Sequence, residues 1–209
     1  MGNKWKQILY LLILLIVAPM LSFAAGFDAL KKTYAGVSAL EANFHQKLYI
    51  ASIKKVREFD GEFFYKLGRG FLWRYTKPKV KYFLYDGKYM WQDEEDKTFV
   101  LKGKINKNKK EDIFFNLVED ITKLDDLFVL KQENMAGDME VLVLAPKKEG
   151  SITSAKVWID TQNIVKKIEM QEFTGNINTI EFSDIKVNQS ISDGTFMYKP
   201  DKQKEILER

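Results

Sequence analysis

The chain has 209 residues, of which 45% are hydrophobic, 13% aromatic and 30% charged, a composition typical of a globular protein with one domain or at most two small ones. It has no cysteine and a single histidine, so disulfides, thiolate metal sites, cysteine nucleophiles and multi-histidine metal sites are excluded. The formal net charge of +4 is too small to indicate nucleic-acid binding.

The N-terminus is typical of a secretory signal peptide. Lys4 and Lys6 precede an unbroken apolar run over residues 8–18, and small residues flank a cleavage site after Ala24. This run is shorter than the roughly 20 residues that a membrane-spanning helix needs, although retention as an anchor is the alternative interpretation. We therefore expect residues 1–24 to be a cleaved signal peptide and residues 25–209 to form a single exported domain.

The first half of the exported chain is predicted to contain one helix followed by short strands. Phe27, Leu30 and Tyr34 recur at steps of three and four residues, as in an amphipathic helix. Beyond residue 40 the apolar period shortens towards two, and Asp86-Gly87 between two aromatic runs is a strong hairpin signal. The predicted strands begin at Phe44 and then cover residues 56–67, 71–75, 82–85, 88–91 and 98–102.

A second amphipathic helix is predicted over residues 111–124, because Phe114, Leu117, Val118 and Ile121 lie at i, i+3, i+4 and i+7. Strands then resume at residues 127–132, 140–144, 157–160, 164–173 and 178–187. So many closely spaced strands predict a mainly β protein with helices (α+β), an antiparallel meander closed or partly closed into a barrel. Residues 196–209 are expected to be a short apolar segment followed by a charged tail.

No set of residues predicts an enzyme. The acidic residues 93–96 are expected in a solvated hairpin loop, whereas acid–base catalysis needs a carboxylate in a walled pocket. His45 has no partners that would complete a metal site, and Gly68-Arg69-Gly70 lacks the further glycine and helix start of a phosphate loop. We therefore expect neither catalytic residues, nor a metal, nor a cofactor.

Large apolar side chains are the most informative feature, since consecutive strands between Phe63 and Trp91 carry them at alternating positions. Two interpretations remain open. Such side chains usually fill a core, but a sheet that curls without collapsing leaves its concave face as a cavity lined by them. In that case the helix at 111–124 would cover the cavity.

Several short motifs follow one another in a specific order over nearly all of the exported chain. They are Phe44-His45-Gln46, the glycine-led strand at 61–66, Phe71 with Trp73, Tyr75 and Pro78, the Asp86-Gly87 hairpin ending in Trp91, and the Gly175-Asn176 turn. Each motif is weak alone. Together they resemble the LolA family, the periplasmic carriers of outer-membrane lipoproteins.

This resemblance implies an incomplete antiparallel β-barrel with a helical lid or plug over an apolar cavity. It implies a monomeric periplasmic carrier of a Gram-negative bacterium that binds acylated lipoproteins and no nucleic acid. The implied partners are an inner-membrane ABC transporter of the LolCDE type and, where one exists, the outer-membrane receptor LolB. The alternative is a lipid- or lipoprotein-sensing regulatory module, because periplasmic stress-signalling proteins use the same fold.

By motif position and strand alternation, we expect a set of strand residues to line the cavity: Phe63, Tyr65, Phe71, Trp73, Tyr75, Leu84, Trp91, Ile168, Ile180 and Phe182. The apolar face of the lid is assigned to Phe114, Phe115, Leu117 and Ile121. The chain departs from the family at Leu67, where relatives have an arginine tied to lid closure, and at Leu72, where they also have an arginine. Arg69, two residues beyond Leu67, is the candidate to contact the lid in its place.

Overall fold

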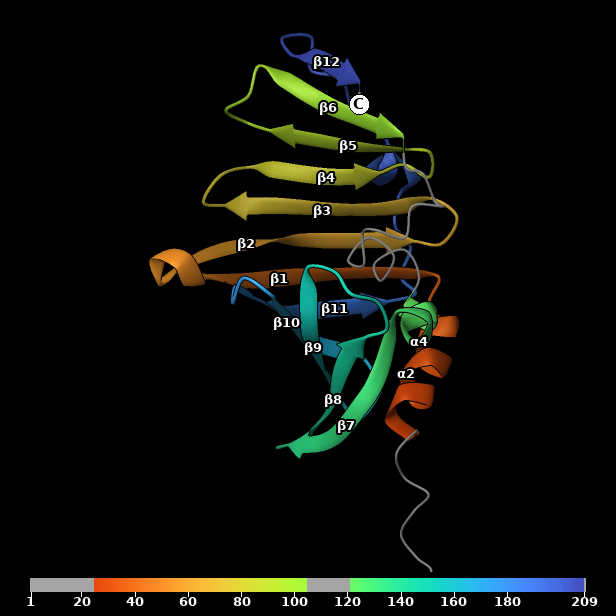
Figure 1. Ribbon diagram of the computed structural model, residues 1–209. Coiled ribbons are helices and arrows are strands. Elements are labelled where there is room, and N and C mark those ends of the chain that lie inside the picture. Colours follow the sequence, from red (N-terminus) through yellow and green to blue (C-terminus); the bar gives the residue numbers. More distant parts are fainter. Residues whose placement is uncertain (1–24, 105–120, 209) are drawn as a thin grey trace, which may run out of the picture.

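The computed structural model describes residues 25–104 and 121–208 (Figure 1). The predicted signal peptide therefore lies outside the described residues. The first half contains helix α2 (Ala25–Ala35) and the strands β1 (Ala39–Ile50), β2 (Lys55–Lys66), β3 (Gly70–Lys77), β4 (Lys81–Tyr85), β5 (Tyr89–Glu94) and β6 (Phe99–Lys104), with the 3₁₀ turn η1 (Ala51–Ile53) between β1 and β2.

The second half begins with the 3₁₀ turn η2 (Ile121–Lys123) and the short helix α4 (Leu124–Leu127). Its strands are β7 (Phe128–Ala136), β8 (Met139–Pro146), β9 (Ile152–Ile159), β10 (Val165–Glu172), β11 (Ile177–Val187) and β12 (Glu205–Glu208), with the 3₁₀ turn η3 (Asp193–Phe196) before β12.

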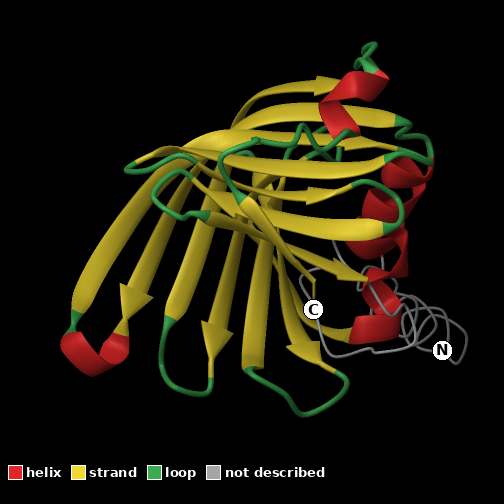
Figure 2. Cartoon of the chain, turned by 90° about the horizontal axis from the view of Figure 1, so that it is seen from above, coloured by secondary structure: helices red, strands yellow, loops and turns green. Residues whose placement is uncertain are grey.

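The described strands form one sheet in the order β12-β6-β5-β4-β3-β2-β1-β11-β10-β9-β8-β7. Two antiparallel meanders, β1 to β6 and β7 to β11, are joined by the pairing of β1 with β11, and only β12 pairs in parallel, with β6. The sheet is open, because β12 and β7 are its two edges. It is strongly curved, and β7 and β8 run steeply across the direction of β1 to β5 (Figures 1 and 2). The prediction of an incomplete antiparallel barrel is confirmed.

Strand register decides which side chains share a face, since directly paired residues point to the same side of a sheet. Ala42 pairs with Phe63 and Phe63 with Trp73, so these three residues lie on the concave face. Leu72 pairs with Leu84, and these two lie on the opposite, convex face.

The core is divided into three clusters of buried side chains. In the first, Leu30 of α2 and Leu124 of α4 pack against β8 to β10, so the two helices cover that part of the concave face. The second cluster is aromatic and occupies the concave face of the central strands around Phe44 and Trp73. The third lies on the convex face, where the segment carrying Phe196 covers β3 to β6.

The Asp86-Gly87 hairpin forms as predicted. Gly87 has φ +87°, and the Asp86 carboxylate accepts hydrogen bonds from the backbone N–H of Tyr89 at 2.7 Å and from the indole N–H of Trp91 at 2.7 Å. The carboxylate thus satisfies N–H donors that follow the turn and fixes the position of β5.

Several boundaries differ from the sequence prediction. Asp93 and Glu94 belong to β5 and not to a loop, and Asp93 forms an ion pair with Lys204 at 2.6 Å. The charged tail contains β12, which the sequence did not predict because no apolar alternation marks it. Of the helix predicted over 111–124, residues 111–120 lie outside the described residues, and residues 121–123 form a 3₁₀ turn.

Candidate functional site

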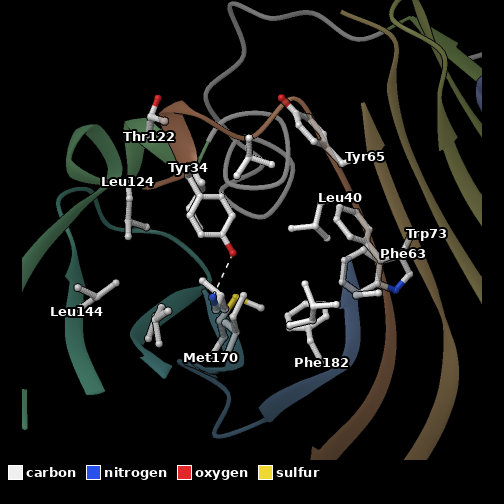
Figure 3. Close-up of a pocket in the computed structure, with 18 of the residues that line it drawn as sticks. Tyr34, Leu40, Phe63, Tyr65, Trp73, Thr122, Leu124, Leu144, Met170 and Phe182 are labelled. Carbon is white, nitrogen blue, oxygen red and sulfur yellow. Dashed lines mark hydrogen bonds between the residues drawn. The ribbon is translucent and has the colours of Figure 1, made fainter. Parts of the chain in front are cut away.

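A cavity of about 130 Å³ lies between the concave face of the sheet and the helical segments (Figure 3). Its lining is almost entirely apolar, and the hydroxyl groups in it belong to Tyr34, Tyr65 and Thr122. The lining residues are Tyr34, Val37, Leu40, Ala42, Phe63, Tyr65, Trp73, Ile121, Thr122, Leu124, Phe128, Leu144, Ala155, Val157, Val165, Ile168, Met170, Phe182 and Ile185.

Both halves of the sheet contribute to the cavity wall. Leu40, Phe63 and Trp73 come from β1 to β3, whereas Leu144 and Met170 come from β8 and β10. These two groups face each other because the sheet curls around the pairing of β1 with β11 (Figure 3). A flat sheet could not bring them together, so the cavity is a consequence of the curvature.

Aromatic rings stiffen one wall. The Trp73 ring lies 4.8 Å from that of Phe44, 4.9 Å from that of Phe63 and 6.1 Å from that of Phe182, measured between ring centroids. Contacts at these distances are favourable beyond the area that they bury. The Trp73 side of the cavity is therefore a packed wall, while Phe182 is only half-buried.

Tyr34 ties α2 to the sheet through the cavity. Its ring reaches between the two walls, and its hydroxyl oxygen accepts a hydrogen bond of 3.1 Å from the backbone N–H of Val165 on β10 (Figure 3). Burial raises the pKa of Tyr34 to about 12. The hydroxyl is therefore neutral at physiological pH, and the cavity wall keeps its uncharged character.

Six of the sequence-predicted residues lie in the cavity lining. They are Phe63, Tyr65, Trp73, Ile168 and Phe182 of the predicted lining, and Ile121 of the predicted lid. Phe71, Tyr75 and Ile180 belong to the aromatic cluster of the concave face but are not in the lining; Tyr75 instead donates a hydrogen bond of 2.8 Å to the Gln46 side chain. Which of these residues contact lipid stays a prediction.

The placement of Leu84 and Trp91 on the concave face was wrong. Leu84 pairs with Leu72 and with Trp91, so all three lie on the face opposite Trp73. There Trp91 stacks on Tyr198, with ring centroids 4.2 Å apart. The physical reason is that both faces of this sheet are buried here, so an aromatic side chain does not by itself indicate the concave face.

Of the predicted lid, Phe114, Phe115 and Leu117 lie outside the described residues. Leu67 is exposed, and Arg69 forms an ion pair with Asp193, with 2.6 Å between Nη2 and Oδ2. A contact between Arg69 and the lid stays a prediction.

Sequence reasoning missed the lining residues of the helical side and of β8 and β9, such as Tyr34, Leu124, Leu144 and Val157. On β9 a signal was present, because Ala155 and Val157 flank the polar Lys156, whereas β8 is an unbroken apolar run over residues 141–145 that does not show which side chains face inward. These strands were recognised, but their side chains were not assigned to the cavity.

Among residues 25–104 and 121–208, the acidic and histidine residues form no group of three that could hold a metal ion. His45 lies on the convex face, where its Nδ1 is 2.7 Å from Oδ1 of Asp60, away from the cavity. Within the same ranges, the helices are too short or too polar to cross a membrane.

Comparison with known proteins agrees with this architecture. Residues 35–199 match the family model described as outer membrane lipoprotein carrier protein LolA. The outer-membrane lipoprotein carrier protein of Chromobacterium violaceum is 24% identical over 184 residues, which cover 88% of each chain.

Two solved structures share the fold. An uncharacterized conserved protein from Thermus thermophilus superposes with a TM-score of 0.58 at 10% identity, over 88% of this chain and 98% of that one. MucB, in its complex with MucA from Pseudomonas aeruginosa, superposes with a TM-score of 0.50 at 8% identity, over 84% of this chain and 60% of that one.

Proposed function

This chain belongs to the LolA family of outer-membrane lipoprotein carrier proteins, and from that premise we propose that it carries acylated lipoproteins through the periplasm from the inner to the outer membrane. Carriers of this family are binding proteins, not enzymes. In the proposed cycle the signal peptide 1–24 directs export. An ABC transporter of the LolCDE type then loads the carrier, which delivers to LolB where that receptor exists.

The observation that carries the proposal is the apolar cavity between the curved sheet and α2. Moving an acyl chain from membrane to water costs about 0.8 kcal/mol per CH₂ group, so a chain of about 14 such groups costs on the order of 11 kcal/mol. A cavity lined by Leu40, Phe63 and Trp73 offers an environment close to that of the membrane. Loading and release can then both occur without a large energy change.

The size of the cavity bears on how the chain enters. About 130 Å³ is similar to apolar protein cavities that hold a molecule of the size of benzene, and smaller than the roughly 300–1,000 Å³ of typical ligand sites. We propose that the cavity widens during loading. In this proposal Phe114, Phe115 and Leu117 form, with Ile121, the apolar face of the lid that moves.

The proposal is tested by acyl-chain binding. A hydrophobic dye is titrated into residues 25–209, and the bound dye is displaced with a triacylated lipopeptide or with its deacylated twin. We expect displacement by the acylated form alone. Displacement by both forms, or by neither from a dye-loaded protein, would contradict an acyl-binding cavity.

A matched pair of variants locates the binding. Phe182→Glu places a charge at a half-buried lining position and should weaken lipopeptide binding at least tenfold, since an unpaired charge beside an acyl chain is costly. Leu72→Glu, at a half-buried position of the convex face, should leave the affinity unchanged. Trp73→Glu is unsuitable for this test, because Trp73 is deeply buried among other rings and a charge there would unfold the protein.

The second candidate function is a lipid- or lipoprotein-sensing module, which the likeness in fold to MucB brings into consideration. Depletion in the cell separates the two. Loss of a carrier should first retain lipoproteins in the inner membrane, whereas loss of a sensor should first change a stress response with lipoprotein sorting intact.

A further inference from the structure

Three turns meet at one end of the sheet, away from the start of β1. The backbone N–H of Ala51, in the β1–β2 turn, donates a hydrogen bond of 3.0 Å to the Asn176 side chain in the β10–β11 turn. The N–H of Phe173, in that same turn, donates one of 3.0 Å to the carbonyl of Ser151 in the β8–β9 loop. We refer to these residues as the three-turn end: 50–57, 147–151 and 172–176.

Apolar side chains of the three-turn end are unusually exposed. Phe173 is 72% exposed, Val56 56% and Ile53 52%. Single apolar residues are common on protein surfaces, but three at one end of the sheet, in connected turns and at the start of β2, form a feature that interaction sites share. Phe173 lies in a turn, where no packing within the sheet requires an aromatic ring.

Positive charge surrounds these side chains. The three-turn end contains five basic residues and only two acidic ones, Glu149 and Glu172. All five basic side chains are exposed, and none of them forms an ion pair with another residue of the described ranges; they are Lys54, Lys55, Arg57, Lys147 and Lys148.

The β2–β3 turn, at the opposite end of the sheet, provides an internal comparison. Leu67 is 66% exposed there, in the β2–β3 turn, so exposure of an apolar side chain is not unique to one end. However, the basic residues on either side of it, Lys66 and Arg69, both pair with Asp193, at 2.7 and 2.6 Å. Among the described residues, apolar exposure therefore coincides with basic side chains outside any ion pair at the three-turn end, whereas the basic residues that flank Leu67 in its own turn are paired.

We propose that the three-turn end docks on the surface of a membrane that contains anionic lipids. Exposed aromatic and aliphatic side chains partition into the boundary between headgroups and acyl chains, while basic residues attract anionic headgroups, and the two effects add. Phe173 and Ile53 enter the interface, and Lys54, Lys55 and Lys148 contact the headgroups. A bilayer fits this combination because it presents anionic charge and accessible apolar volume together.

The position of this surface suits a carrier. Met170, which lines the cavity, precedes Phe173 by three residues on β10, and Leu144, also in the lining, precedes Lys147 by three residues. At about 3.3 Å per strand residue, the docked turns lie roughly 10 Å along the chain from the cavity wall. The inference goes beyond the proposed function, because docking needs no cargo and specifies where the protein meets lipid.

The experiment measures co-sedimentation of cargo-free residues 25–209 with vesicles. One set contains phosphatidylethanolamine with about one-third phosphatidylglycerol, and the other contains only phosphatidylcholine. We expect binding to the anionic vesicles alone, and its loss at about 0.5 M salt, where the Debye length falls to a few ångströms. Absence of binding to anionic vesicles, or equal binding to both sets, overturns the proposal.

Substitutions assign the binding to the surface. The double variant Lys54→Glu with Lys55→Glu should weaken binding at least 25-fold, since each basic residue near an anionic membrane contributes roughly fivefold. Phe173→Glu should weaken it at least tenfold, whereas Leu67→Glu, at a similarly exposed position of the other end, should not. Wild-type binding by Phe173→Glu, or an equal loss in Leu67→Glu, overturns the proposal.

The acyl-binding assay separates this inference from the proposed function. The variants at the three-turn end change exposed residues outside the cavity lining, so lipopeptide should displace dye from them as it does from the wild type. Lost vesicle binding with intact lipopeptide binding supports the docking surface. Lost lipopeptide binding in Phe173→Glu would mean that Phe173 serves the cavity, which overturns its assignment to a docking surface.

Discussion

Filling part of the cavity should stabilise the protein and weaken ligand binding. Ala155 lies on β9, is buried and lines the cavity. The substitution Ala155→Leu adds three carbon atoms to a side chain that borders this space. Growth of a side chain into a cavity should therefore have the opposite effect to overpacking in a filled core, which is destabilising.

The magnitude follows from the volume. An unfilled cavity costs about 24 cal/mol per Å³, so 130 Å³ corresponds to about 3 kcal/mol of lost stability. Three buried carbon atoms, at about 0.8 kcal/mol each, can recover about 2 kcal/mol of it. We expect Ala155→Leu to raise the free energy of unfolding by up to about 2 kcal/mol and to weaken dye binding at least tenfold.

The assay is urea unfolding followed by tryptophan fluorescence, together with dye titration of each variant. Ala39→Leu is the matched control, since Ala39 is also buried in a strand but belongs to the convex-face cluster. It should lose about 1–3 kcal/mol of stability and keep its dye affinity. If Ala155→Leu is destabilised as much as Ala39→Leu and binds dye normally, the space is filled in solution and the reasoning fails.

Three further predictions concern stability. Tyr34→Phe should lower the free energy of unfolding by about 1–3 kcal/mol, because it leaves the Val165 N–H without its acceptor; an unchanged urea midpoint would show that water replaces the hydroxyl. Burial raises the pKa of Tyr34 and Tyr75 to about 12, so the folded state holds these protons more tightly than the unfolded state. The stabilisation from these two hydroxyl groups should therefore be fully present below about pH 10 and be lost between about pH 10 and 12. The urea midpoint should fall over this range, and it should fall less steeply in Tyr34→Phe. Midpoints that rise with pH would contradict this. Arg69→Ala should cost less than about 1 kcal/mol, because its ion pair with Asp193 is half-exposed; a larger loss would indicate a further contact of this side chain.

The sequence was sufficient to predict the strands of this fold apart from β12, but not the face to which each aromatic side chain points. Alternation identifies a strand, and the Asp86-Gly87 turn identifies a hairpin, because both signals are local. The face of Trp91 depends on its pairing with Leu84 and on the convex-face segment that carries Tyr198, which is more than a hundred residues away. A side chain that looks like a cavity residue in the sequence can therefore belong to a second core.

The same limit applies to β12 and to the cavity. β12 contains as many acidic as apolar residues and forms by pairing with the edge of β6, so its own sequence carries no strand pattern. The cavity joins Trp73 on β3 to Leu144 on β8 only because the sheet curls, and the degree of curl is a property of the whole chain. Phe63, Trp73 and Phe182 could be predicted because they occupy family motifs or alternate within single strands.

An open sheet retains two edges at which a second copy could add a strand, a risk that a closed barrel does not have. Here both edges carry charge on exposed side chains: Glu205 and Glu208 on β12, and Lys131 on β7. Like charges would be brought together by pairing two β12 edges, and an edge of four residues offers few hydrogen bonds in return. The charged edges thus disfavour the addition of a strand from another molecule, so the sheet can remain open around its cavity.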